Sequence, residues 1–388
     1  LEAYQGLVSA FEQRHPDIRV ELIHIPSQTD YRQRLAVDFA AGTPADVVLL
    51  NYRRYASFAD RGVLEPLGPY LAQSTTLKEE DFYPQAVGPF RWDTGLMCIP
   101  QNISSLVVYY NKDLFKAAGL AEPGGEWTWD DLLRAAQALT HDPDGDGITD
   151  QYGLGTEVSF QRVAPLIWQN QGELVDNPFF PRRLALTTPE ALRAITWFVD
   201  LQVRHHVAPD AEAEQAEDSE SRFLNGRLAM FFNSRRGVPT YRTITAFDWD
   251  VAPVPRTGNR QTNILHADAY CMAAVTKDKA SAWTLIEFAN SAEGQTLVAA
   301  SGRTVPSLIA VAESPAFLDP NAKPQHSRVF LDTIPHLRAV PVLPNWADIE
   351  AITSDELERA FYGAATAGEA MQSAVARTDE YFKISAGP

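Results

Sequence analysis

The chain has 388 residues, of which 45% are hydrophobic and 21% charged, and its formal net charge is −17. This length exceeds one ordinary hydrophobic core and predicts two domains, while the apolar content excludes a disordered chain. The acidic balance argues against a nucleic-acid partner, and no uncharged apolar run reaches the roughly 18 residues that a transmembrane segment needs.

The first predicted elements alternate between helix and strand. Apolar residues at helical spacing over Tyr4–Phe11 indicate a helix from the start of the chain, and no signal peptide is recognisable. This helix should end before Pro16, and the alternating residues 18–25 then predict a strand. A helix over 30–42 follows. The apolar run at 47–50 favours a parallel strand that is covered on both faces.

Later segments continue this mixture of helices and strands. Further strands are predicted at 96–99, 106–110, 228–233, 249–255 and 269–275. Helix starts are indicated by Thr128 with Asp131, by Thr188-Pro189-Glu190, by Thr353 with Glu356, and by Thr366 with Glu369. The order predicts an α/β protein of two lobes, with crossings near 105–110 and 255–268. The cleft between two lobes is the default place for a ligand.

The two cysteines, Cys98 and Cys271, each lie in an apolar stretch. We interpret them as two buried free thiols. A disulfide would require their strands to be neighbours with suitable geometry, which the sequence does not establish.

An ordered set of segments resembles a known family. LVSAFEQRHPDIRVELI, AAGTPADVVLLN, YYNKDLFKAAGL, TWDDL and FLNGRLAMFFNSRR are similar to segments of the extracellular solute-binding proteins of ABC importers, nearest to the carbohydrate-binding, maltose-binding branch. The resemblance covers nearly all of the chain, although that family usually has a strand ahead of the first helix. It implies a type II periplasmic-binding-protein-like fold, with two lobes joined by a hinge and the ligand cleft between them.

The resemblance also implies an organisation and a role. The expected N-terminal lobe comprises residues 1–106 and 266–315, the C-terminal lobe comprises 107–265 and 316–388, and the hinge segments lie near 103–110, 258–268 and 312–320. The expected protein is an exported monomer, periplasmic or lipid-anchored at the outer face of the membrane. It captures a disaccharide or oligosaccharide and delivers it, chemically unaltered, to a membrane permease.

Candidate ligand residues combine polar side chains with aromatic rings, because sugars present hydroxyls and weakly apolar ring faces. Ligands of α/β sheets bind beyond the carboxyl ends of strands. The predicted set is Asn51, Tyr52, Arg53, Asn102, Ser104, Phe160, Gln161, Asn233, Arg235, Arg236, His266, Asp268, Arg303 and Trp346. Other roles stay open: Phe160 and Trp346 could be packing residues, and the arginines could form surface ion pairs.

An aspartate-rich loop predicts a possible structural calcium site. Asp142, Asp144, Asp146 and Asp150 occupy positions 1, 3, 5 and 9 of an EF-hand-like loop, and the Ile148 carbonyl occupies position 7. Position 12 is a glycine and not the usual bidentate Glu, so another ligand would have to come from elsewhere. The alternative is a tight Asp/Gly turn whose side chains bond their own backbone.

Two rival functions remain at this point. A glycoside hydrolase would need a pair of carboxylates flanking the scissile bond, and Asp268 is the only acidic residue among the candidate ligand contacts. A binding protein for an anionic or phosphorylated solute, such as a glycerophosphate, would instead use Arg53, Arg235, Arg236 and Arg303.

Overall fold

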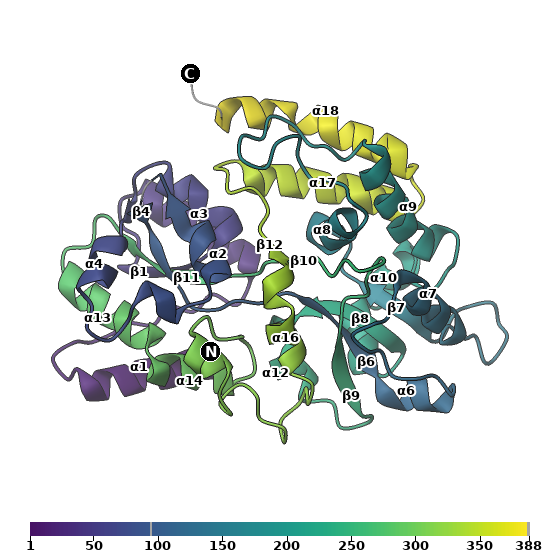
Figure 1. The fold of residues 1–388 in the computed structure, drawn as a ribbon, viewed down its shortest axis with the longest axis horizontal. Coiled ribbons are helices and arrows are strands. Elements are labelled where there is room, and N and C mark those ends of the chain that lie inside the picture. The colour runs from purple at the N-terminus through teal and green to yellow at the C-terminus, as the bar shows by residue number, and fades with distance from the viewer. Residues whose placement is uncertain (94, 386–388) are drawn as a thin grey trace. The chain divides into compact units, whose positions relative to one another are not determined.

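The computed structural model describes residues 1–93 and 95–385, which group into two compact units (Figure 1). Unit 1 comprises Leu1–Ser104, Leu265–Leu318 and Val342–Pro344, and unit 2 comprises Ser105–Ile264, Asp319–Pro341 and the chain from Asn345 onward. The expected lobes assigned all of 316–388 to the C-terminal lobe. In the structure, residues 316–318 and 342–344 group with unit 1.

The sheet of unit 1 is built around β11 (Asp268–Ala273). This strand pairs antiparallel with β1 (Val47–Asn51), β2 (Leu64–Glu65) and β5 (Cys98–Pro100). The prediction of a parallel strand at 47–50 is therefore wrong. A continuous apolar run reports burial and not direction, and the neighbour of β1 comes from the second segment of the unit rather than from a helical crossover.

Helices surround this sheet. They are α1 (Glu2–Arg14), α2 (Gln28–Ala40), α3 (Tyr52–Ala59), α4 (Gly68–Gln73), α5 (Pro84–Val87), α13 (Lys279–Asn290), α14 (Ala292–Ala300) and α15 (Ile309–Ala312), with short 3-10 turns at Glu79–Asp81 and Gly88–Phe90. A small hairpin joins β3 (Arg91–Trp92) to β4 (Gly95–Leu96). The helices predicted before Pro16 and over 30–42 are confirmed, and Gly42 adopts the left-handed conformation, with φ of 71°, two residues after α2 ends.

Residues 18–25 do not form the predicted strand. Alternation of apolar and polar residues describes how side chains point along an extended segment, but a strand also needs a partner for its backbone groups. No backbone ladder joins this segment to another described residue. Ile23, one of its apolar residues, is 58% exposed.

The expectation of two free thiols is also wrong. Cys98 and Cys271 form a disulfide between β5 and β11. The antiparallel register places these two residues directly opposite each other, with their Cα atoms 4.5 Å apart. This separation is typical of a non-hydrogen-bonded antiparallel pair and lies within the range that a disulfide spans.

The main sheet of unit 2 has the strand order β7-β8-β6-β9. Its strands are β6 (Leu106–Asn111), β7 (Tyr152–Thr156), β8 (Leu228–Ser234) and β9 (Trp249–Pro253). β6 pairs antiparallel with β8 and β9, whereas β7 and β8 are parallel. A separate parallel pair joins β10 (Asn263–Ile264) to β12 (Leu337–Arg338). The strands predicted at 106–110, 228–233 and 249–255 are confirmed.

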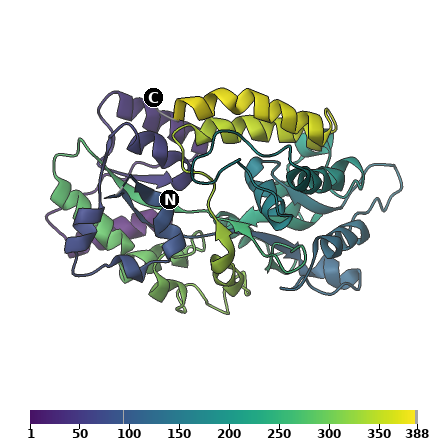
Figure 2. The same cartoon turned by 45° about the horizontal axis from the view of Figure 1, so that its top comes forward.

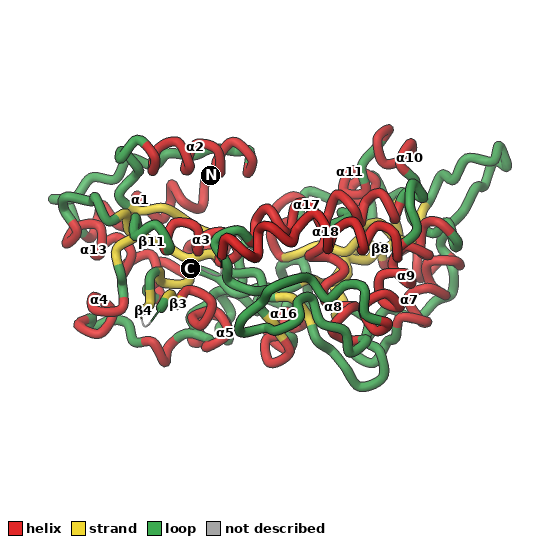
Figure 3. The backbone as a smooth tube through the Cα atoms, turned by 90° about the horizontal axis from the view of Figure 1, so that it is seen from above, coloured by secondary structure: helices red, strands yellow, loops and turns green. Residues whose placement is uncertain are grey.

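The helices of unit 2 lie around this sheet, with α11 packed on β8 (Figure 3). They are α6 (Lys112–Ala117), α7 (Trp129–Ala138), α8 (Phe160–Gln169), α9 (Pro189–Val203), α10 (Ala211–Ala216), α11 (Ser219–Leu224), α12 (Val238–Tyr241), α16 (Arg328–Asp332), α17 (Trp346–Phe361) and α18 (Ala367–Ser385), with 3-10 turns at Arg235–Gly237 and Ile334–His336. The last two helices, α17 and α18, run side by side (Figure 2). Within the described part of the chain, no helix combines the length and the apolar character that crossing a bilayer requires.

Three of the four predicted helix starts are confirmed. Thr128 caps α7 and Thr188 caps α9, while Thr366 and Glu369 bond reciprocally at the start of α18. Thr353 is the exception, because α17 already begins at Trp346. The Thr353 hydroxyl donates to the Ile349 carbonyl inside the helix, a bond that competes with capping.

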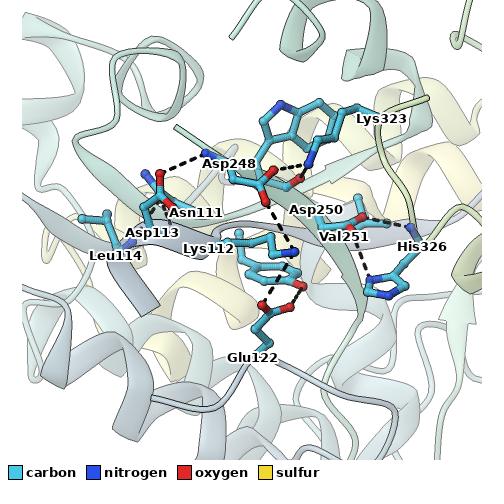
Figure 4. Close-up of polar contacts among 12 residues, drawn as sticks. Asn111, Lys112, Asp113, Leu114, Glu122, Asp248, Asp250, Val251, Lys323 and His326 are labelled. Atoms are coloured by element: carbon cyan, nitrogen blue, oxygen red, sulfur yellow. Dashed lines mark hydrogen bonds and ion pairs between the residues drawn. The ribbon is translucent and has the colours of Figure 1, made fainter. Parts of the chain in front are cut away.

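The segment 319–341 is fixed onto the rest of unit 2 by polar contacts (Figure 4). Lys323 pairs with Asp248 and donates to the Trp249 carbonyl at 2.9 Å. The backbone N–H of His326 donates to Asp250 Oδ1 at 3.0 Å, and its ring Nδ1 lies 3.2 Å from Oδ2. These contacts anchor the part of the chain that returns to unit 2 after residue 318.

Candidate functional site

In unit 1, a polar network surrounds the carboxylate of Asp268. Asn51 at the end of β1 lies opposite Asp268 in the antiparallel register. The Asn51 amide donates to Asp268 Oδ1 at 3.0 Å, and the Asn102 amide donates to Oδ2 at 3.0 Å. Each carboxylate oxygen thus has one fixed donor and retains lone pairs for another. Asp268 is only half-buried, so these lone pairs can accept hydrogen bonds from ligand hydroxyls.

Arg53 belongs to the same network through Asn51. The Asn51 side-chain oxygen accepts from the Arg53 backbone N–H at 3.2 Å, which caps α3, and from Arg53 Nε at 3.1 Å. The helix start therefore orients the guanidinium. It places a cationic donor and the Asp268 carboxylate around one shared amide.

Tyrosine hydroxyls extend the network on the side of Gln101. Gln101 Nε2 donates to Tyr270 Oη at 2.7 Å, and Tyr4 Oη donates to Gln101 Oε1 at 3.2 Å. Arg303 lies near the Tyr4 hydroxyl, and its positive charge opposes the rise in the pKa of Tyr4. Burial raises the pKa of Tyr4 despite the hydrogen bond from Gln101, and burial raises the pKa of Tyr270 well above its ordinary value. Both hydroxyls are therefore neutral and can donate at physiological pH.

The sequence-based set omitted these tyrosines and Gln101. Tyr270 lies in β11 opposite Ile99, two residues from Asp268 and on the same face of the strand, so strand alternation offered a signal for it. Gln101 adjoins the predicted Asn102. Tyr4 belongs to the first helix, far from these residues in sequence, and no local pattern pointed to it.

Other predicted residues of unit 1 lie in different environments. The side chain of Tyr52 is fully buried. Ser104 and His266 form a backbone bridge, with N–H to carbonyl distances of 2.7 and 2.8 Å in the two directions. Arg303 is exposed. The structure therefore brings Asn51, Arg53, Asn102 and Asp268 together, and it places Arg303 beside Tyr4.

In unit 2, Asn233 is held by a second buried network. Its side-chain oxygen accepts from Arg162 Nη2 at 3.1 Å, and its amide donates to Tyr241 Oη at 2.6 Å. Tyr241 in turn donates to Glu220 at 2.6 Å. Burial, followed by neighbouring charges, raises the pKa of Tyr241, so the hydroxyl stays protonated as a donor. Both ends of the Asn233 amide are thereby engaged within the unit.

The two arginines after β8 have opposite environments. Arg235 is 2% exposed, donates to Ser327 Oγ at 3.0 Å, and lies 5.2 Å from the centroid of the Phe330 ring. Burial lowers the pKa of Arg235 to about 9. Arg236 is exposed. The predicted pair therefore divides into a core residue and a surface residue.

Aromatic candidates of unit 2 meet at the starts of α8 and α17. The rings of Phe160 and Trp346 lie 6.0 Å apart at 33°. Trp346 is fully buried, and its indole Nε1 has no hydrogen-bond partner among the residues that the structure describes. Gln161 donates to Glu350 at 2.7 Å. A buried indole N–H usually finds an acceptor, so the Trp346 Nε1 is an unsatisfied donor among the described residues, while the burial of its ring fits the alternative of a packing residue.

The aspartate-rich loop brings together three exposed carboxylates. Ligand atoms of Asp142, Asp144 and Asp146 lie within 4.8 Å of one another. Their oxygens also accept backbone N–H groups of the loop, for example from Gly147 to Asp142 at 2.9 Å. Desolvation and the three neighbouring carboxylates raise the pKa of Asp150. Asp150 is not part of this group of three, and the side chain of Ile148 is 68% exposed. The calcium site stays a prediction.

Comparison with known proteins identifies relatives along most of the chain. A family model described as bacterial extracellular solute-binding protein matches residues 1–296. A binding protein of Brucella abortus (strain 2308) is 24% identical over 396 residues, covering 98% of this chain and 90% of its own.

Solved structures show the same fold. An ABC substrate-binding protein from Listeria monocytogenes in complex with cycloalternan superimposes with a TM-score of 0.90 at 23% identity, covering 98% of this chain and 96% of its own. UgpB from Mycobacterium tuberculosis in complex with glycerophosphocholine superimposes with a TM-score of 0.84 at 20% identity, covering 99% and 95%. The predicted α/β fold of the two-lobed solute-binding type is confirmed by this likeness.

Proposed function

Because this chain belongs to the bacterial extracellular solute-binding proteins, we propose that it binds a neutral disaccharide or oligosaccharide and delivers it to the permease of an ABC importer. The observation that best supports this proposal is the Asp268 carboxylate, which is held by the amides of Asn51 and Asn102. A carboxylate with both oxygens oriented and lone pairs to spare accepts hydrogen bonds from vicinal hydroxyls.

The neighbours of Asp268 supply the complementary donors. Arg53 offers a guanidinium oriented through Asn51, and the neutral Tyr270 hydroxyl, which accepts from Gln101, keeps its own proton to donate. Such a mixture suits a polyol, since each hydroxyl both donates and accepts. A sugar epimer that left one of these buried groups unpaired would lose about 1–3 kcal/mol, so the network supports specificity.

In unit 2 we expect Phe160 and Trp346 to act as packing residues rather than as an exposed stacking surface, because both side chains are buried and their rings lie against each other. Arg236 adds an exposed guanidinium after β8. We expect Asn233 and Arg235 to support this region from within the unit rather than to contact the sugar, because their polar groups are already bonded to Arg162, Tyr241 and Ser327.

An anionic ligand is the less favoured alternative. The Mycobacterium tuberculosis UgpB structure holds glycerophosphocholine, so this fold accommodates phosphodiesters. In this chain, however, the Asp268 carboxylate lies at the centre of the unit 1 network and would repel a phosphate. Arg235 is also turned into the core, which leaves fewer cations for an anion.

We propose that the protein binds its oligosaccharide without hydrolysing it. The relatives described above are binding proteins. A glycoside hydrolase needs two carboxylates roughly 5–9.5 Å apart across the scissile bond, whereas the network described in unit 1 is centred on one, that of Asp268. Incubation of the purified protein with oligosaccharides, followed by chromatography, should recover them intact. Time-dependent cleavage would overturn this part of the proposal.

A thermal-shift screen against neutral mono- and oligosaccharides, polyols and glycerophosphates tests the ligand class. We expect a neutral sugar to raise the melting temperature, because a ligand that binds only the folded chain stabilises it. The shift should vanish in Asp268→Asn and persist in Asp278→Asn, a matched change at the N-cap of α13 that retains capping ability. A response confined to glycerophosphates and abolished by salt would instead favour the anionic alternative.

We also propose that the aspartate-rich loop binds Ca²⁺ weakly and in a structural role. Extracellular calcium modules have dissociation constants of about 10⁻⁴–10⁻³ M, so 1 mM Ca²⁺ should stabilise unit 2 by roughly 0.4–1.4 kcal/mol. Urea unfolding with CaCl₂ or MgCl₂ measures this, with the double variant Asp142→Asn and Asp144→Asn as control. Equal stability of wild type and variant in both salts would exclude a calcium site.

A further inference from the structure

A hairpin between α8 and α9 exposes two adjacent phenylalanines. Phe179 and Phe180 are 83% and 76% exposed, which are the two highest values among the large hydrophobic residues that the structure describes as exposed. Both belong to unit 2. Single exposed apolar side chains are common on proteins, but two neighbouring aromatic rings in solvent indicate a surface with a binding role.

The base of this hairpin is firmly built. Val175 and Leu184 form an antiparallel backbone bridge, and both side chains are buried. A further backbone bond joins the Ala185 N–H to the Leu174 carbonyl at 2.9 Å. The two strands of the hairpin are therefore tied to unit 2, and only the tip projects into solvent.

The tip is also preorganised. Asn177 Oδ1 accepts the backbone N–H groups of Phe179 and Phe180 at 2.9 and 3.1 Å, and Asp176 Oδ1 accepts that of Arg182 at 2.9 Å. Prolines stand on either side of the phenylalanine pair. Because the backbone is already ordered, little conformational entropy is lost when the two phenylalanine rings become buried against a partner.

Cationic side chains follow the aromatic pair. Arg182 and Arg183 are exposed, and Arg183 Nε lies 4.0 Å from an Asp176 oxygen. The nearby carboxylate of Glu173 is bound by Arg338 at 3.2 and 2.7 Å. The hairpin thus presents positive charge on a chain of net charge −17. The distant acidic residues matter little at contact, because physiological salt screens charges beyond about 8 Å.

The apolar area of the tip helps to identify its partner. Two phenylalanines bury roughly 150–250 Å² each, whereas a specific protein interface takes about 800 Å² from each partner. A bilayer requires less, since a few apolar side chains can enter the boundary between headgroups and acyl chains while cations bind lipid phosphates. We propose that the hairpin 175–184 is a membrane-contacting element, with Phe179 and Phe180 inserted and Arg182 and Arg183 on anionic headgroups.

This contact would keep unit 2 at the membrane surface, where an importer lies. The proposal depends on the family's extracytoplasmic placement and not on which solute is bound. It therefore goes beyond ligand capture and can fail or succeed independently of it.

Vesicle flotation tests the proposal directly. The purified protein is floated with phosphatidylcholine vesicles containing one quarter phosphatidylglycerol, and with vesicles of phosphatidylcholine alone. We expect the wild type to bind the anionic vesicles at least about fivefold more than the double variant Phe179→Ser and Phe180→Ser. The double variant Arg182→Gln and Arg183→Gln should lose the preference for anionic lipid and its sensitivity to salt.

The control variant is Val203→Ser with Val275→Ser, which removes two exposed valines elsewhere and should float like the wild type. Melting curves of all variants verify folding. Equal flotation of the wild type and the phenylalanine variant, or no flotation of the wild type up to millimolar lipid, would overturn the proposal. So would sedimentation showing a dimer that the phenylalanine variant loses, because the hairpin would then bind a second copy. Sugar-induced thermal shifts of the same variants report separately on ligand binding.

Discussion

Two strand ends in this molecule share a sequence pattern but have different surroundings. In unit 1, β1 runs through LLN into YRR, and in unit 2, β8 runs through FFN into SRR. Each has an apolar strand, an asparagine at or next to its end, and a pair of arginines. Around Asn51 the neighbours are the Asp268 carboxylate and the Asn102 amide, whereas Asn233 is enclosed by Arg162 and Tyr241.

The cross-strand partners and the packed helices together account for this difference. Asn51 faces Asp268 across the β1–β11 ladder, while Asn233 faces Val107 across the β8–β6 ladder. The first asparagine therefore orients a half-exposed carboxylate, and the second is absorbed into a buried network. A local motif specifies which polar groups are present, but the residues around the strand end in the folded chain decide whether those groups remain available to a ligand.

Removal of the disulfide is the change with the largest expected effect, and it should destabilise unit 1 much more than unit 2. Replacement of Cys98 and Cys271 by alanine is expected to destabilise unit 1 by about 3–4 kcal/mol, because a disulfide that closes a long loop restricts the unfolded chain. Unit 2 contains no cysteine and should be little affected. Hydrogen exchange followed by mass spectrometry would detect faster exchange in β5 and β11. Equal loss of protection in β6 and β8 would show that the two units unfold together.

Asp268→Ala tests whether the strand end in unit 1 contributes to ligand binding. We expect at least a hundredfold loss of affinity, about 2.7 kcal/mol, for the sugar that the thermal screen identifies, because two oriented acceptor oxygens disappear. Calorimetric titration measures this. Asn233→Ala should instead lower the urea midpoint. If Asn233→Ala weakened binding as much as Asp268→Ala at unchanged stability, the contrast between the two strand ends would be wrong.

The arginine pair after β8 offers a comparison between neighbours. Arg235→Ala removes a buried hydrogen bond and a ring contact and should cost about 2 kcal/mol of unfolding free energy. Arg236→Ala should change stability by less than about 0.5 kcal/mol, as is usual for an exposed side chain, and should weaken sugar binding about tenfold, ~1.4 kcal/mol. Urea unfolding and calorimetry of both variants would reveal whether these roles are exchanged.

The smallest expected effect is the loss, at acid pH, of the stability that the contact between Asp248 and Lys323 gives to the folded chain. Burial alone would raise the pKa of Asp248, but its hydrogen bond and ion pair with Lys323, aided by Lys112, lower it below 3.8. The carboxylate therefore stabilises the folded chain above pH about 4 and loses this contribution as the pH falls through its lower folded pKa.

The difference in urea midpoint between wild type and Asp248→Asn should accordingly be present at pH 6 and shrink as the pH falls through the lowered pKa of Asp248. Asp248 is nearly half exposed, so the difference at pH 6 should stay below about 1 kcal/mol. A difference that grows as the pH falls would contradict the lowered pKa.

Local signals in the sequence determined much of the architecture. Capping residues located α7, α9 and α18, and apolar runs located β1, β6, β8 and β9. These signals succeed because capping and strand burial involve residues close together in the chain. The ordered set of segments also identified the family. Asn51 and Arg53 were predicted from their place after a strand, Asn102 from its place after a strand and in the segment expected to cross between lobes, and Asp268 from its place beside the second expected crossing.

Tertiary structure alone decided which groups meet. Pairing of β11 with both β1 and β5 joined Cys98 to Cys271 and brought Asp268 between two amides, and no local pattern encodes that register. The same dependence explains why residues 18–25 alternate without forming a strand and why Arg235 lies in the core beside an exposed Arg236. Side-chain chemistry is a property of the sequence, but hydrogen-bond partners and burial are properties of the folded neighbours.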